Sequence, residues 1–214
     1  MPEGRGFAPQ YASVQHRDEA AEIGIWVFLA TELLLFGGLL FAYFVYRHAN
    51  PAAFAAASRH TDIVIGTANT AILLTSSFLV ACAVDALQAG ARRICIMLLI
   101  GAMLLGLLFL SLKATEYAGE YHEHLVPGIN FSFAPPLADG AELFFTIYFV
   151  ATSIHAIHMM IGIAVLAALA IMLRRTASTR LCAALRTAAL YWHFVDAIWI
   201  VLFALIYLPG RSGA

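Results

Sequence analysis

The feature that most constrains this chain is a series of apolar blocks, each close to the length that crosses a bilayer. A helix needs roughly 17–25 mostly apolar residues to span the hydrocarbon region of a membrane. The sequence contains five such blocks, at residues 23–46, 63–86, 94–113, 143–173 and 190–208. Charged residues make up 12% of the chain, whereas soluble domains carry about 25%. These patterns predict an all-α integral membrane protein with one domain, a bundle of five transmembrane helices.

The segments outside the blocks exclude several other classes of protein. Residues 1–22 lack the apolar core of a signal peptide, so we expect the first span to stay in the mature chain, and residues 209–214 form a short tail. The net charge of −1 gives no indication of nucleic-acid binding. Cys82, Cys95 and Cys182 lie far apart in the sequence, which predicts neither a disulfide framework nor a zinc site.

The distribution of basic residues predicts the orientation. With five spans, the N-terminus shares one side of the membrane with the second and fourth loops. That side carries Arg5, Arg17, Arg92, Arg93, Arg174, Arg175, Arg180 and Arg186, and the other side carries Arg47, Arg59, Lys113 and Arg211. Because short cytoplasmic loops are enriched in Lys and Arg, we expect a cytoplasmic N-terminus and a C-terminus on the outside.

One acid, Glu32, lies near the middle of the first apolar block. A charge at the centre of a bilayer costs at least about 2.5–3.5 kcal/mol, so such a residue usually faces the bundle interior and has a partner. We expect the Glu32 carboxyl to be protonated at neutral pH, because burial disfavours the charged form. The residue is then either a structural hydrogen-bond donor between helices or a proton-active group.

Two pairs of polar residues in later spans are possible partners or sites. His155 and His158 are three residues apart and therefore share a helical face. Such a pair could bind a metal or haem, or it could be hydrogen-bonded at a helix interface. His193 and Asp196 have the same spacing, and Asp could orient His by accepting its ring proton. They form either a proton-relay dyad or a structural pair near the cytoplasmic interface.

The end of the third span carries a row of acids. Glu116, Glu120 and Glu123 recur at helical spacing, which predicts one face of a helix that continues beyond the membrane. We interpret this face as solvated, or alternatively as a partner-docking surface. The residues by themselves leave three classes open: a small transporter or proton channel, a haem-binding membrane anchor, and a subunit of a larger membrane complex.

Several ordered segments together resemble subunit III of the haem–copper respiratory oxidases. They are "WVFLATELLLFGGLLFAYF", "NTAILLTSS", "KATEY", "FFTIYFVATSIHAIHMMIG" and "YWHFVDAIWIVLFALIYL", between about Gly24 and Tyr207. The chain is similar to the five-helix bacterial form of cytochrome c oxidase subunit III, which lacks the two N-terminal helices of the seven-helix form.

The resemblance implies a place in aerobic electron transport. It implies a subunit that carries no haem or copper itself, because both are in partner subunits. The complex would lie in the bacterial inner membrane, oxidise cytochrome c, reduce oxygen to water and pump protons. The chain would pack directly against subunit I, beside subunit II, stabilise it, support proton uptake and hold phospholipid. A quinol oxidase subunit III and the nitric oxide reductase accessory protein of the same superfamily are the alternatives.

The resemblance also implies roles for individual residues. Glu32 falls at the family's buried glutamate, which reacts with hydrophobic carbodiimide. Arg174 and Arg175 fall where family members place basic residues that meet lipid phosphates. The positions that match buried polar residues of the family, none of them redox ligands, are His155, His158, Glu116, His193 and Asp196.

Overall fold

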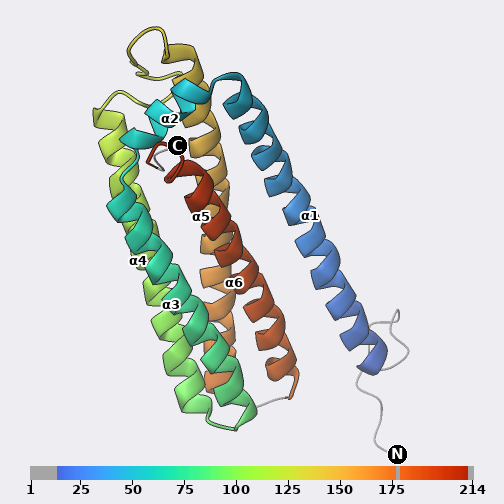
Figure 1. The fold of residues 1–214 in the computed structure, drawn as a ribbon. Coiled ribbons are helices and arrows are strands. Elements are labelled where there is room, and N and C mark those ends of the chain that lie inside the picture. Colours follow the sequence, from blue (N-terminus) through green and yellow to red (C-terminus); the bar gives the residue numbers. More distant parts are fainter. Residues whose placement is uncertain (1–13, 177–178, 212–214) are drawn as a thin grey trace, which may run out of the picture.

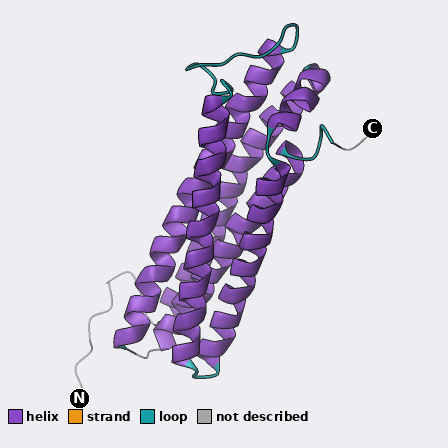
Figure 2. Ribbon diagram, turned by 90° about the vertical axis from the view of Figure 1, so that its left-hand side faces the viewer, coloured by secondary structure: helices purple, strands orange, loops and turns teal. Residues whose placement is uncertain are grey.

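The computed structural model describes residues 14–176 and 179–211, and in this part of the chain all regular structure is helical (Figures 1 and 2). The helices are α1 (Val14–Ala49), α2 (Pro51–His60), α3 (Ile63–Gln88), α4 (Arg92–His122), α5 (Ala138–Arg175) and α6 (Thr179–Ile206). Five of them, all except α2, are long and apolar enough to cross a membrane. The predicted all-α fold with five membrane-spanning helices is therefore confirmed.

The helices are longer than the apolar blocks that predicted them. Helices α4 and α5 contain 31 and 38 residues, which at 1.5 Å per residue gives lengths of roughly 46 and 57 Å. The hydrocarbon core of a bilayer is only about 30 Å thick. Both helices therefore extend beyond the bilayer core unless they are strongly tilted.

Local sequence signals set the bounds of α3. Its N-cap residue, Asp62, accepts hydrogen bonds from the backbone N–H groups of Val64 (2.8 Å) and Ile65 (3.1 Å). At the other end, Gly90 has a φ of +76° and the Ala91 N–H bonds to the Ala86 carbonyl at 2.8 Å. This is a Schellman motif, in which glycine takes the left-handed conformation without a steric cost. It makes the tight turn that lets α4 return along α3.

The C-terminal end of α4 has the same motif with a different residue. His124 has a φ of 58°, and the Leu125 N–H donates to the Glu120 carbonyl at 2.9 Å. Leu125 is only 2% exposed, as expected for the apolar contact of a Schellman motif. The loop after α4 is thereby folded back over the last helical turn.

Helices α3, α4, α5 and α6 form a four-helix bundle in which glycines permit close packing. Gly106 of α4 and Gly162 of α5 both lie against the Trp192 ring of α6. A Cβ atom added at Gly162 would lie 3.0 Å from that ring, and one added at Gly106 would lie 3.2 Å from it. The Trp192 indole N–H donates to Ser76 Oγ of α3 at 3.1 Å, so this one side chain contacts three neighbouring helices.

Helix α1 lies at the side of this bundle, and Figure 1 shows it leaning away toward its N-terminal end. Its buried residues Leu29, Phe36 and Tyr43 recur every seven positions and form one stripe against α5 and α6. The opposite face is apolar and exposed, with Leu34 76% and Phe41 71% accessible. An apolar, exposed face is suited to lipid or to another membrane subunit.

The short helix α2 crosses the end of the bundle beside the C-terminal residues (Figure 1). The apolar blocks did not predict it, although Pro51 at its first turn is a typical helix-start residue. The Arg211 guanidinium donates to the carbonyls of Ser58, Arg59 and Thr61, at the C-terminal end of α2. Arg59 Nε in turn donates to the Gly210 carbonyl at 2.7 Å. These bonds satisfy helix-end carbonyls that would otherwise be unpaired.

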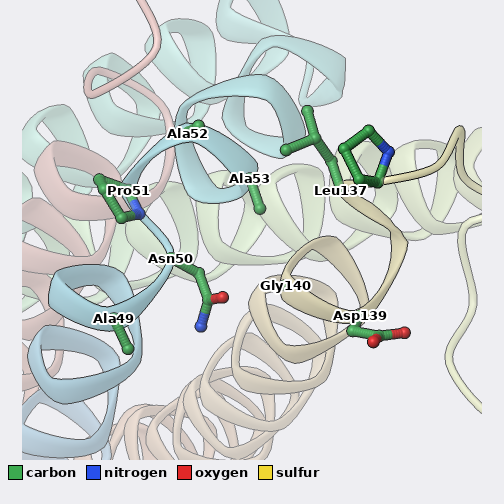
Figure 3. Close-up of a pocket in the computed structure, with 9 residues that line it drawn as sticks. Ala49, Asn50, Pro51, Ala52, Ala53, Leu137, Asp139 and Gly140 are labelled. Atoms are coloured by element: carbon green, nitrogen blue, oxygen red, sulfur yellow. The ribbon is translucent and has the colours of Figure 1, made fainter.

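A hollow of about 310 Å³ lies where α2 meets the start of α5 (Figure 3). Of its lining residues only Asn50 and Asp139 have polar side chains. The two helices approach closely here, because a Cβ added at Gly140 would come within 2.6 Å of Ala53 Cβ. The hollow is therefore a seam between closely packed helices, and the polar chemistry of the chain lies deeper in the bundle.

Candidate functional site

Glu32 of α1 and His158 of α5 form a side-chain pair. Glu32 Oε2 and His158 Nε2 are 2.9 Å apart, and the two side chains are 14% and 11% exposed. His158 Nδ1 lies 2.8 Å from the Ile154 carbonyl, which can only accept, so Nδ1 carries a proton. Nε2 then either accepts a proton from a neutral Glu32 or donates to an ionised one. The pair can therefore move one proton between two atoms without losing its hydrogen bond.

Aromatic residues hold this pair in place. The Phe36 ring lies 5.5 Å from the His158 ring, centroid to centroid, and the Tyr191 hydroxyl donates to the His158 carbonyl at 3.0 Å. Phe28 of α1 packs on the Tyr191 ring at 5.9 Å. The prediction that Glu32 has a partner in the fourth span is confirmed, and this contact is a polar link between α1 and the bundle. Its protonation state stays a prediction.

The acidic row on α4 is not a solvated face. Glu116 and Glu120 are 5% and 4% exposed, and only Glu123, at the helix end, is exposed. The interpretation of this row as solvated is therefore wrong for its first two members. The reason is that α5, α6 and the loop after α4 cover the last turns of α4.

Lys113, the one lysine in the sequence, is the centre of this buried cluster and is 3% exposed. Its ammonium group donates to Glu116 Oε2 at 2.9 Å, to the Tyr148 hydroxyl at 2.7 Å and to the Tyr207 hydroxyl at 2.8 Å. These bonds use all three donors of a lysine. Glu116 also accepts from the Tyr207 hydroxyl, at 2.7 Å to Oε1. A complete hydrogen-bond set of this kind is what a buried ion pair requires.

Lys113 and its tyrosine partners were missed as site residues. The distribution of basic residues places Lys113 at a helix end, among the charges that set the orientation, but its side chain lies inside the bundle. The lysine at position i and the glutamate at i+3 are a pairing signal for a helix, and this signal could have identified the ion pair. Nothing in the local sequence indicates the tyrosines, which come from α5 and the end of α6.

His155 has surroundings quite different from those of His158. It is completely buried, and its ring packs against Phe109 at 5.5 Å and Trp199 at 5.2 Å. Neither ring nitrogen has a hydrogen-bond partner among the described residues. The shared helical face of the two histidines therefore does not make them a joint site: His158 pairs with α1, whereas His155 points into an aromatic layer.

His193 and Asp196 are not bonded to each other, so they form neither the proton-relay dyad nor the structural pair that their spacing suggested. His193 Nδ1 lies 2.6 Å from Ser77 Oγ of α3, and the two carboxyl oxygens of Asp196 have no hydrogen-bond partner in the described part of the chain. The Ser77 hydroxyl lies near both residues, but its bond is to the histidine. Spacing along α6 put the two side chains on one face, and packing against α3 then determined the partner.

The remaining predicted positions lie at a helix end. Arg174 and Arg175 are exposed in the last turn of α5. Within the described ranges, 14–176 and 179–211, no three His, Cys, Asp or Glu side chains are grouped so that they could hold a metal ion. The polar groups inside the bundle are thus distributed over separate pairs and clusters: Glu32 with His158, Lys113 with Glu116, and His193 with Ser77.

The fold and these buried groups define a multi-pass helical membrane protein. Comparison with known proteins specifies the family: residues 12–211 match the family described as cytochrome c oxidase subunit III. The chain belongs to this family, whose homologues are subunits of terminal oxidase complexes.

The relatives include oxidases with two kinds of electron donor. The chain is 28% identical to cytochrome c oxidase subunit 3 of Thermostichus vulcanus, over 98% of this chain and 97% of that protein. It is 27% identical to quinol oxidase subunit 3 of Bacillus spizizenii, over 94% of this chain and 95% of that protein. It is 25% identical to the probable quinol oxidase subunit 3 of Staphylococcus aureus USA300, over 91% and 92% of the two chains.

Proposed function

We propose that this chain is the non-redox subunit III of a proton-pumping terminal oxidase, in which it packs directly against the haem–copper subunit I, beside subunit II. The observation that carries the proposal is the family match over residues 12–211, which includes every buried polar pair described above. The exposed apolar face of α1 supplies a surface on which subunit I or lipid can pack. Haem and copper are then held by the partner subunits.

The Glu32–His158 pair suits a role in protein stability and proton supply. Both side chains are largely shielded from their surroundings, and one proton can be held on either side of the 2.9 Å contact. We infer that the pair fixes α1 to the bundle and buffers protons for subunit I. Neither residue would be required for oxygen reduction, which takes place in subunit I under this proposal.

Replacing Glu32 with Gln tests this role. Glutamine keeps the size of the side chain and removes its acidity, so we expect labelling by hydrophobic carbodiimide to be lost. Initial oxidase turnover should remain largely intact, and any defect should appear in the proton-pumping yield or in the number of turnovers before inactivation. Glu123→Gln, at an exposed acid, is the matched control. Complete loss of turnover in an assembled complex with a normal haem spectrum would contradict the proposal.

The electron donor is cytochrome c in the simpler proposal and a quinol in the second. Relatives of both kinds are matched at almost the same identity, 28% and 27%. The assay is oxidation of reduced cytochrome c or of a quinol by the complex that co-purifies with this chain in mild detergent. Co-purification with no haem–copper subunit would exclude both and would favour a stand-alone channel.

Orientation and lipid binding complete the proposal. We infer a cytoplasmic N-terminus, with Arg174 and Arg175 contacting anionic lipid headgroups, where a basic residue gains about 1 kcal/mol. Replacing both arginines with Gln should reduce the lipid retained by the purified complex, and unchanged lipid content by mass spectrometry would contradict this. A reporter active only in the cytoplasm, fused after residue 214, should be inactive.

A further inference from the structure

The cluster around Lys113 contains more acid than base. Lys113, Glu116 and Glu120 follow one another along the inner face of α4, and each is at most 5% exposed. The lysine supplies one positive charge, whereas the two carboxyls would supply two negative charges if both were ionised. The ion pair of Lys113 with Glu116 is complete, because all three donors of the ammonium group are used.

Glu120 is the acid of the cluster that Lys113 does not bind, since the ion pair of Lys113 is with Glu116. Neither of its carboxyl oxygens has a hydrogen bond in the described part of the chain, although both are buried. The loop after α4 folds back at this residue: the Leu125 N–H donates to the Glu120 backbone carbonyl at 2.9 Å, and Leu125 is itself buried. An ionised carboxylate is very costly at a buried position unless it is fully hydrogen-bonded, so burial favours the protonated form of this side chain.

Several titratable groups face Glu120. Lys113, Glu116 and Glu123 lie near it on its own helix, and Tyr148 of α5 lies close on the other side. The Tyr148 hydroxyl accepts from Lys113, so its own proton is free to point toward the Glu120 carboxyl. Tyr207, which directly follows α6, lies on the far side of the cluster, and the exposed Glu123 is about one turn along α4 from Glu120.

We propose that Glu120, with Lys113, Glu116 and Tyr148, forms a proton-binding site that holds one exchangeable proton. The ligand is a proton delivered by water at the end of the bundle that carries α2. The site lies on α4 and is separate from the Glu32–His158 pair of α1 and α5. It depends on no redox partner, and it would exist whichever electron donor the complex uses.

The experiment is infrared spectroscopy of the purified complex in water and in D2O. The difference between wild type and Glu120→Gln should contain the carbonyl band of a protonated carboxylic acid, shifted in D2O because the proton exchanges. Glu123→Gln and Glu32→Gln are the controls and should leave that band in place. If the Glu120→Gln complex fails to assemble, Glu120→Asp serves instead, since it moves the band to a new frequency.

A second variant tests the charge count itself. With Glu116→Gln, Lys113 is left with Glu120 as its only acid, so Glu120 should ionise and its protonated-acid band should disappear. A difference spectrum of wild type and Glu120→Gln without an acid carbonyl band would overturn the proposal. Persistence of the Glu120 band in the Glu116→Gln complex would also overturn it, because protonation would then not follow from the excess of acid over base.

Discussion

Replacing Lys113 with Met should be one of the most damaging single changes in this chain. Methionine fills a similar volume but removes the ammonium group of a residue that is only 3% exposed and is bonded to Glu116, Tyr148 and Tyr207. Removing one partner of a buried ion pair costs about 3–5 kcal/mol, because the other charge is left uncompensated. At 1.4 kcal/mol per factor of ten, that corresponds to about two to nearly four powers of ten in the folding equilibrium.

A second substitution separates the charge effect from the packing effect. In the double variant Lys113→Met/Glu116→Gln both members of the ion pair are gone, and the new amide side chain still offers an oxygen to the Tyr207 hydroxyl. Neutral replacement of a whole buried pair is often tolerated, so this double variant should recover at least about 2 kcal/mol of the loss. Glu123→Gln, at an exposed position, should stay within about 0.5 kcal/mol of wild type.

The assay is a titration of the solubilised complex with a denaturing detergent, followed by the fraction of this chain that remains folded. A Lys113→Met complex as stable as wild type would refute the assignment of Lys113 as a buried ion-pair partner. A double variant no more stable than Lys113→Met would also refute the reasoning, since the cost would then come from lost packing rather than from an unpaired acid.

Two further predictions follow from close contacts. Gly162→Ala should destabilise the complex by about 1–3 kcal/mol, because the added methyl group lies 3.0 Å from a Trp192 ring that Ser76 holds in place. Gly119→Ala, an exposed position with nothing within 4 Å of the added Cβ, should be neutral or stabilising. Thermal inactivation in detergent measures both, and equal effects would contradict the packing argument. Arg211→Gln should loosen α2, because the carbonyls of Ser58, Arg59 and Thr61 lose their donor. Proteolysis within α2 should then be faster than in the wild-type protein.

The spans could be predicted because hydrophobic length alone decides them. Block 63–86 differs from α3, Ile63–Gln88, by only two residues at one end. The 10-residue helix α2 could not be predicted in this way, since it is too short and too small in its side chains to give an apolar signal. Its place is determined instead by contacts with residues 206–211, far along the chain.

The candidate site was predictable only where the sequence contained a rare group. Glu32 and His158 were identified because ionisable side chains within an apolar run need a partner, and the two are each other's partners. Lys113 was misplaced because it stands at the edge of its apolar block, where the local sequence cannot distinguish a buried group from a solvated one. The expected pairing of His193 with Asp196, as a dyad or as a structural pair, was wrong because periodicity gives the face of a helix and not the residue packed across from it.

The bonds between α2 and the end of α6 have a consequence for the order of biogenesis. Ser58 Oγ donates to the Ile206 carbonyl at 2.7 Å, and the Arg211 guanidinium donates to the Ser58 carbonyl at the end of α2. In each of these bonds the two residues are about 150 positions apart in the chain. During synthesis α1 and α2 are complete long before Arg211 leaves the ribosome. The loop between the first two spans is therefore secured last, and a chain truncated before residue 206 would retain most of its apolar spans yet lack the contacts that close this end of the protein.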